Sequence, residues 1–268
     1  MAISKHDNMS FLEHLEELRW HVIRSLIAII SAGFVCFLMK DFIFDTIIFG
    51  PKKMDFPTYK FLCQAATFIG VETNFCGDEF PFVVQNRTMA GQFSAHVMTS
   101  VISGFILSFP YVLYEFWKFI SPGLLEKEKA KSRGFIFISS ILFFVGVLFG
   151  YYVISPLSIN FLGTYQVSAQ VLNEIDLGSF ISLVRSSALA SGIIFELPII
   201  IYFLTKAGVV TPESLVKYRK YALVLVLILA AIITPPDVAS QIIVAIPIVV
   251  LYQVSIFISR IVVKNQNK

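Results

Sequence analysis

Residues 134–154 form a stretch of 21 residues without a single Asp, Glu, Lys or Arg. About 20 consecutive apolar residues in a helix are enough to cross the hydrocarbon core of a bilayer. Hydrophobic segments of this kind lie at residues 22–39, 95–116, 134–154, 180–204, 221–233 and 238–258. The sequence therefore predicts an all-α fold: a polytopic membrane protein with six transmembrane helices.

The composition supports a membrane protein over a soluble one. Hydrophobic residues make up 56% of the chain and charged residues 15%, whereas a soluble domain carries about 25% charged residues to cover its core. The first twenty residues are too rich in charge for the apolar core of a cleavable signal peptide, so we expect the first span to remain as an anchor. The net charge of +3 comes from short loops between spans, which gives no reason to expect nucleic-acid binding.

The last two predicted helices are short. Residues 221–233 would extend roughly 20 Å as a helix, less than the roughly 30 Å of a hydrocarbon core. Either the bilayer thins there or this helix is buried against its neighbours. Four prolines lie in or at the ends of spans, and proline bends a helix by removing a hydrogen bond; they are Pro110, Pro156, Pro198 and Pro247. Bent helices suit a cradle-like bundle.

The distribution of Lys and Arg predicts the orientation. Five basic residues follow the second span, four follow the fourth span and three lie in the tail: Lys118, Lys127, Lys129, Lys131 and Arg133, then Lys206, Lys217, Arg219 and Lys220, then Arg260, Lys264 and Lys268. The opposite side has its few basic residues spread over a large loop, residues 43–93, and none at all in residues 160–179. Because basic loops stay in the cytoplasm, we expect both termini there and residues 43–93 in the periplasm.

The large periplasmic loop contains two of the three cysteines. Cys63 and Cys76 have 12 residues between them, while Cys36 lies in the first span. In an oxidising compartment the loop pair predicts a disulfide, worth about 3 kcal/mol for a ring of this size. The alternative is two unpaired thiols.

The helix expected to lead into the first span carries a cluster of acids. Glu13 and Glu17 lie four residues apart with Glu16 beside them, and like charges at that spacing repel. A cationic partner would relieve the repulsion. The alternative is pairing within the helix, Glu16 with Arg19 and Glu17 with His21, on an ordinary solvated face.

Two further acidic positions require an explanation. The loop after the second span carries Glu126 and Glu128 among lysines, where a local ion-pair network is one interpretation. Glu196 lies inside the fourth span, where a carboxylate costs about 2.5–3.5 kcal/mol. It therefore needs a polar partner on another helix, a proton or a ligand, and Gln241 and Gln253 of the last span are candidates within the chain.

Four short motifs occur in order along the predicted spans: HLEELR at residues 14–19, FISPGL at 119–124, FELP at 195–198 and TPPDVASQ at 234–241. Together they resemble the TatC family, the multi-spanning subunit of the twin-arginine protein translocase. The resemblance extends from about residue 11 to residue 260, so residues 1–268 are expected to form a single TatC-like membrane domain. Residues 54–92, which hold both loop cysteines, form a longer loop than we expect for the family.

The resemblance implies a receptor of the bacterial inner membrane and not an enzyme. It would bind twin-arginine signal peptides of folded proteins through Glu17 and Glu128, with Arg19 and Phe119 in the same site. Two separate carboxylates, each able to take a guanidinium through two hydrogen bonds, explain a preference for arginine over lysine. Glu196 and Gln241 correspond to positions that contact small single-span subunits of the TatA and TatB type.

The same resemblance implies a complex driven by proton-motive force, with several copies of the chain in it, and it calls for no cofactor, metal or catalytic residue. The main alternative is a secondary transporter or proton-coupled channel that uses Glu196 as its ion site. Such proteins often contain internal repeats, and we find none. A membrane enzyme is a weaker alternative, because the four histidines (His6, His14, His21 and His96) form no metal-binding or catalytic pattern.

Overall fold

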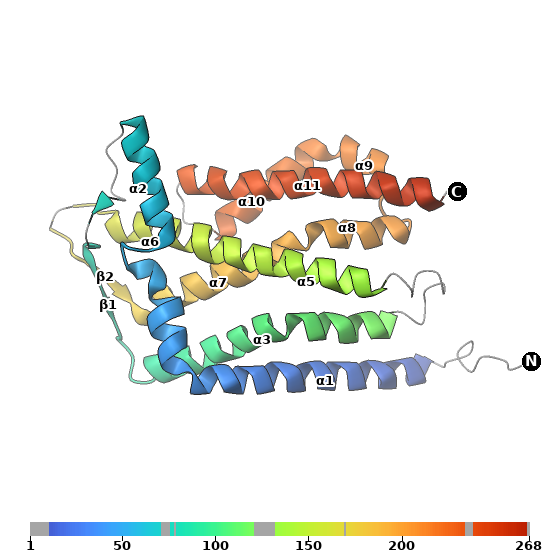
Figure 1. The fold of residues 1–268 in the computed structure, drawn as a ribbon, viewed down its shortest axis with the longest axis horizontal. Helices are drawn as coiled ribbons and strands as arrows, with labels where there is room; N and C mark the ends of the chain where they lie inside the picture. Colours follow the sequence, from blue (N-terminus) through green and yellow to red (C-terminus); the bar gives the residue numbers. More distant parts are fainter. Residues whose placement is uncertain are drawn as a thin grey trace, which may run out of the picture. The chain divides into compact units, whose positions relative to one another are not determined.

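The computed structural model describes residues 11–70, 76–77, 79–120, 132–168, 170–233 and 238–266. Helices dominate them (Figure 1), and the main helices are α1 (Phe11–Leu38), α2 (Pro57–Ile69), α3 (Gly91–Ile120), α5 (Ser132–Phe149), α6 (Ser155–Thr164), α7 (Leu177–Phe195), α8 (Leu197–Lys206), α9 (Pro212–Lys217), α10 (Arg219–Ile233) and α11 (Val238–Gln266). Short helical turns η1 (Phe42–Ile48), η2 (Gly50–Lys52) and η5 (Gly150–Ile154) connect some of them. Two strands, β1 (Phe82–Gln85) and β2 (Asn173–Asp176), complete the fold.

Within the described residues, five helical segments are long and apolar enough to cross a membrane: Leu15–Leu38, Gly91–Ile120, Gly134–Thr164, Leu177–Lys206 and Gln241–Asn265. They correspond to five of the six predicted spans. The remaining one is α10, whose 15 residues extend about 22 Å. It is the helix whose length already falls short in the sequence, and its role as a sixth span stays a prediction, as does the orientation of the termini.

The chain groups into two compact units, and the single membrane domain stays a prediction. Unit 1 comprises Met1–Lys40 and His96–Ile141, and unit 2 comprises Asp41–Ala95 and Leu142–Lys268. In unit 1, α1 and α3 run side by side in opposite directions (Figure 1). Large apolar side chains at one-turn intervals on α1 stay exposed, with Ile30 at 67% and Phe34 at 62%. Such a stripe is what a lipid-facing helix presents.

The α1–α3 pair makes a close contact between glycines. A Cβ on Gly104 would lie 2.5 Å from the backbone nitrogen of Gly33 and 2.6 Å from the carbonyl oxygen of Ile29. Only glycine fits such an approach of two backbones, and small residues are typical of helix interfaces in membranes. Further along, the ring of Phe37 stacks on His96 at a centroid distance of 4.0 Å.

In unit 2, an apolar cluster joins η5, α10 and α11. Its buried members are Ile154, Val226, Ala230, Val244, Ala245 and Ile248. The hydroxyl of Thr205 on α8 donates to Ser259 Oγ on α11 at 2.9 Å, and both side chains are buried. α8 and α11 therefore pack through neutral groups.

The fourth predicted span is broken into α7 and α8 at Glu196. Pro198 occupies the second position of α8, and proline removes one helical hydrogen bond and clashes with the carbonyl four residues earlier. The N–H of Glu196 bonds to Ile193 O at 3.1 Å, a contact with a residue three positions earlier. The predicted bend at Pro198 is thus a change of helix with the acidic residue at the junction.

The prediction of an all-α fold needs a correction, because β1 and β2 form a two-stranded parallel sheet in unit 2 with Phe82 opposite Asn173. The two strands come from different loops, one before α3 and one before α7, and four residues are too few to show a clear alternation of polar and apolar residues. Near them, Cys63 and Cys76 form a disulfide, with their Cα atoms 5.1 Å apart. Cys36 is a buried free cysteine in unit 1.

Candidate functional site

Of the predicted peptide-binding residues, Glu17 and Phe119 come from the facing helices of unit 1. Glu17 lies near the start of α1 and Phe119 in the last turn of α3. The carboxylate oxygen Oε2 of Glu17 is buried, and no described residue gives it a hydrogen bond. Glu126 and Glu128 belong to residues 121–131, outside the described part of the chain, so the role of Glu128 stays a prediction.

His21 contacts a partner that the sequence analysis did not consider. Its Nδ1–H donates to Glu115 Oε2 on α3 at 2.5 Å, and the two side chains are only 7% and 4% exposed. The suggested pairing of His21 with Glu17 one turn earlier is therefore wrong. A buried carboxylate on α3 takes the imidazole, because it needs a charge-assisted hydrogen bond more than a half-buried carboxylate does.

Two arginines of α1 are also held by acids. Arg19 lies 3.3 Å from Glu16, as the pairing within the helix predicts, and both side chains are well exposed. An exposed pair of this kind contributes little stability. Arg24 Nη1 lies 3.9 Å from the same Glu115 oxygen that His21 contacts. Arg19, one of the predicted peptide-binding residues, thus points its charge at Glu16.

Glu115 is the residue that sequence reasoning missed. It lies within the second predicted span, where a single acid does not lower the mean hydropathy enough to break the pattern. The signal was nevertheless present, because an acid inside a span calls for a partner as Glu196 does. Its contacts are with His21, Arg24 and the hydroxyl of Tyr111.

The register of α1 against α3 places Glu17 at the level of Phe119. His21 faces Glu115, and the ring of Phe119 lies edge-on to His21 with centroids 6.2 Å apart. One turn before His21 on α1 is Glu17, and one turn after Glu115 on the antiparallel α3 is Phe119. Glu17 and Phe119 therefore lie at the same level near this end of the helix pair.

In unit 2, Glu196 is half-buried at the junction of α7 and α8, and its neighbours Ile194 and Leu197 pack against the apolar cluster. Gln241, the polar residue predicted to act with it, donates its side-chain amide to the backbone oxygen of Leu227 on α10 at 3.1 Å. That bond ties α11 to α10. Gln253 is exposed.

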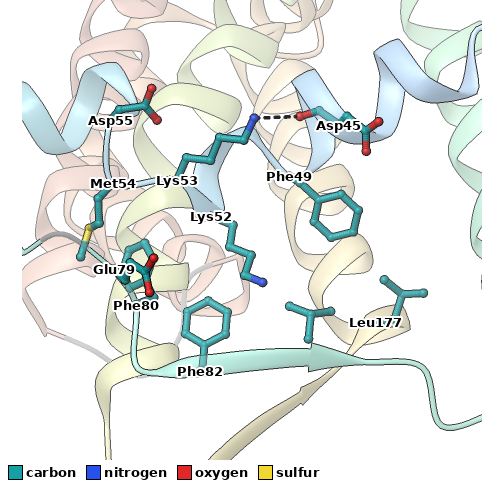
Figure 2. A pocket seen from close by; sticks show the side chains of 11 residues that line it. Asp45, Phe49, Lys52, Lys53, Met54, Asp55, Glu79, Phe80, Phe82 and Leu177 are labelled. Carbon is teal, nitrogen blue, oxygen red and sulfur yellow. Dashed lines mark hydrogen bonds between the residues drawn. The ribbon is translucent and has the colours of Figure 1, made fainter.

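A separate open cavity of about 990 Å³ lies in the outer part of unit 2 (Figure 2). Its lining includes Phe49, Phe80 and Phe82, two lysines and three acids (Lys52, Lys53, Asp45, Asp55 and Glu79). Lys53 Nζ donates to the backbone oxygen of Asp45 at 3.3 Å, and Lys52 Nζ lies 5.9 Å from the centroid of the Phe82 ring. Because both signs of charge surround the cavity, it selects neither a cation nor an anion, and we assign it no ligand.

Among the described residues, no three His, Cys, Asp or Glu side chains come close enough to hold a metal ion. A buried carboxylate oxygen that no described residue hydrogen-bonds suits a guanidinium or ammonium group of a ligand. An acid at a break in an apolar helix suits a hydrogen bond from another helix.

Several apolar helices of spanning length define a multi-spanning α-helical membrane protein. Its two separate acidic positions are Glu17 in unit 1 and Glu196 in unit 2. The family described as Sec-independent protein translocase protein (TatC) matches residues 13–247. The chain therefore belongs to the TatC family of bacterial membrane proteins, and it is a subunit of a protein translocase.

Close relatives cover nearly the whole chain. A Sec-independent protein translocase protein TatC of Blattabacterium (from Periplaneta americana) is 46% identical over 97% of this chain and 98% of its own length. The TatC of Aquifex aeolicus is 34% identical over the same shares. Two solved structures of a twin arginine translocase receptor, TatC, superpose with TM-scores of 0.68 and 0.70 at 32% and 33% identity, covering 94% and 91% of this chain and 100% and 98% of theirs.

Proposed function

We propose that this chain is the signal-peptide receptor of its translocase. It binds the paired arginines of twin-arginine signal peptides at the end of the α1–α3 pair, with Glu17 as one carboxylate and Glu128 as the second. The observation that carries the proposal is the buried Oε2 of Glu17, which no described residue hydrogen-bonds. An incoming guanidinium would supply that missing donor.

Two properties of the surroundings suit a twin-arginine export signal. The ring of Phe119, one turn from Glu115, offers an apolar face on which a planar guanidinium stacks better than a compact ammonium does. The orientation predicted from the loop charges places this end of α1 in the cytoplasm, where export signals arrive. Arg19, held by Glu16, would then line the rim of the site.

The second part of the proposal concerns assembly. Glu196 and Gln241 would contact the single-span TatA- and TatB-type subunits within the membrane, in a complex that holds several copies of this chain and uses proton-motive force. Glu196 lies at a helix break flanked by apolar residues. A partner helix that brings one polar group into this apolar surface would gain a hydrogen bond.

Photo-crosslinking tests the peptide site. A twin-arginine signal peptide with a photoreactive group should crosslink to the wild-type protein in membrane vesicles, and Glu17→Ala with Glu128→Ala should abolish the product. Glu174→Ala is the matched control, since Glu174 is an exposed carboxylate that is already paired with Arg87 at 3.2 Å. Undiminished crosslinking in the double variant would overturn the assignment of these acids.

Co-purification tests the assembly surface. Glu196→Ala should weaken association with the single-span subunits while leaving peptide crosslinking intact, and Glu213→Ala on α9 serves as the control. Loss of peptide crosslinking in Glu196→Ala would contradict separate surfaces. Continued export of a folded, cofactor-bearing periplasmic enzyme in cells lacking this chain would instead favour the transporter alternative.

A further inference from the structure

The starting observation is a helical pair that does not form. Glu17 and His21 are four residues apart on α1, with the acid nearer the N-terminus, which is the arrangement that favours pairing on a helix surface. In the structure the imidazole donates instead to Glu115 on α3 at 2.5 Å. The carboxylate of Glu17 keeps a buried oxygen with no hydrogen bond from any described residue.

Glu115 also holds the next cation along the helix. Arg24 Nη1 lies 3.9 Å from Glu115 Oε2, while Arg19 is taken by Glu16 at 3.3 Å. All three basic side chains described between Leu15 and Leu38 of α1 therefore contact an acid other than Glu17.

We infer that Glu115 is a positioning residue of the peptide site: by holding His21 and Arg24 it keeps the carboxylate of Glu17 open for an arginine of the bound peptide. The inference rests on the proposed function, because it explains how Glu17 stays available. Glu115 contacts no peptide itself in this account. Its role is to remove the competitor that α1 carries one turn away.

The physical reason lies in the geometry of a carboxylate. A guanidinium binds it most strongly through two parallel hydrogen bonds that use both oxygens. A released His21 would occupy one of those oxygens and, when protonated, would cancel the charge that attracts the ligand. The carboxylate of Glu115 is buried, and a buried charge is costly without a donor, so the contact with His21 is favoured and the competitor stays away from Glu17.

A double-mutant cycle separates this role from a merely structural one. The full-length protein in nanodiscs is titrated with a fluorescent twin-arginine signal peptide and with the same peptide carrying two lysines. Glu17→Gln should weaken binding of the arginine peptide about tenfold or more, and Glu115→Gln roughly three- to tenfold. In the Glu17→Gln background, Glu115→Gln should change the affinity less than about twofold, since the carboxylate that it protects is already gone.

Two further variants complete the test. His21→Gln added to Glu115→Gln removes the released competitor and should restore the affinity to within about twofold of wild type. Glu174→Gln is the matched control, because Glu174 is an ion-paired but exposed carboxylate with Arg87 as its partner at 3.2 Å; it should leave the affinity unchanged. Thermal unfolding of each variant shows whether it is folded.

The outcomes distinguish the two proposals. If wild type does not prefer the arginine peptide, or if Glu17→Gln has no effect, the proposed function fails. If Glu17→Gln weakens binding but Glu115→Gln does not, only the positioning role fails. Additive losses in the Glu17→Gln and Glu115→Gln double variant, without rescue by His21→Gln, would also overturn it, since they would show that Glu115 acts through the packing of α1 on α3.

Discussion

The helix pair of unit 1 and the helix group of unit 2 use different polar contacts. α1 and α3 join through charged groups, with Glu115 holding His21 and Arg24. α8 and α11 join through the hydroxyl pair Thr205–Ser259, and α11 meets α10 through the Gln241 amide and a backbone oxygen. Charged contacts can be exchanged for an incoming ion, whereas neutral contacts mainly fix helices in place.

This contrast fits the two proposed roles. A surface that reads a pair of arginines needs a carboxylate whose counter-ion is the ligand, and unit 1 keeps one open by satisfying its own cations elsewhere. A surface that assembles helices needs rigid packing with a single polar position, and unit 2 presents Glu196 next to an apolar cluster. If the two roles are separate, substitutions in unit 1 and in unit 2 should change stability and peptide affinity differently.

The largest effect is expected from Gly104→Ala in unit 1. The added Cβ would meet the Gly33 backbone at 2.5 Å, and a backbone cannot move aside, so stability should fall by about 3 kcal/mol or more. Gly134→Ala is the control, because nothing lies within 4 Å of its Cβ and a helical Ala is favoured over Gly. Thermal unfolding measures both, and equal stability of the two variants would show that charges alone hold the α1–α3 pair.

Removal of the disulfide should affect unit 2 only. Cys63→Ser with Cys76→Ser opens a ring that spans 13 sequence positions, which should cost about 3 kcal/mol. Protease digestion of the outer loop and thermal unfolding in the presence and absence of reductant measure the loss. Peptide affinity should stay at the wild-type value, and a fall in affinity would mean that the units do not act separately.

Tyr59→Phe should cost about 2 kcal/mol, because the fully buried hydroxyl shares its single hydrogen between the backbone oxygens of Pro51 and Pro156, which lie 2.9 and 3.0 Å from it. Burial raises the pKa of Tyr59 above its usual value of 10. The unfolded chain therefore loses this proton first, and the hydroxyl's contribution, complete below pH 10, falls as the pH rises above it. Chemical denaturation between pH 8 and 11 should show that slope in wild type, and Tyr59→Phe should reduce it.

The smallest effect is expected at the hydroxyl pair of α8 and α11. Thr205→Val or Ser259→Ala alone leaves one buried hydroxyl without its partner and should cost about 1–2 kcal/mol. The double variant removes both polar groups and should lie within about 1 kcal/mol of wild type. Denaturation midpoints give the comparison. A double variant that loses as much stability as the two single variants added together would show that each hydroxyl contributes independently of the other.

The spans could be read from the sequence because the bilayer imposes a length and a polarity on each helix. Within the described residues, five segments recur as helices of spanning length. The sixth, α10, has only 15 residues and falls short of that length, as its sequence predicts. The pair Glu16–Arg19 is confirmed because it depends only on helical spacing. Local rules of this kind carry over directly from sequence to structure.

Features that depend on a partner far along the chain were not predicted. Helical spacing alone predicts a pair of His21 with Glu17. In the structure the imidazole contacts Glu115 instead, which lies 94 residues away along the chain. The sheet of β1 and β2 was missed for the same reason, since each strand has four residues and finds its partner in another loop. Sequence motifs single out Glu17 and Phe119, whereas the contacts of Glu115 with His21 and Arg24 depend on how α3 packs against α1.

The parallel pairing of β1 with β2 also sets an order of events during synthesis. Phe82 and Asn173 face each other across about 90 residues of chain, and long-range pairings of this kind form slowly. The first strand leaves the ribosome well before its partner, and α3, α5 and α6 must be made and inserted in between. The sheet therefore forms only after the residues of α3, α5 and α6 have been synthesised.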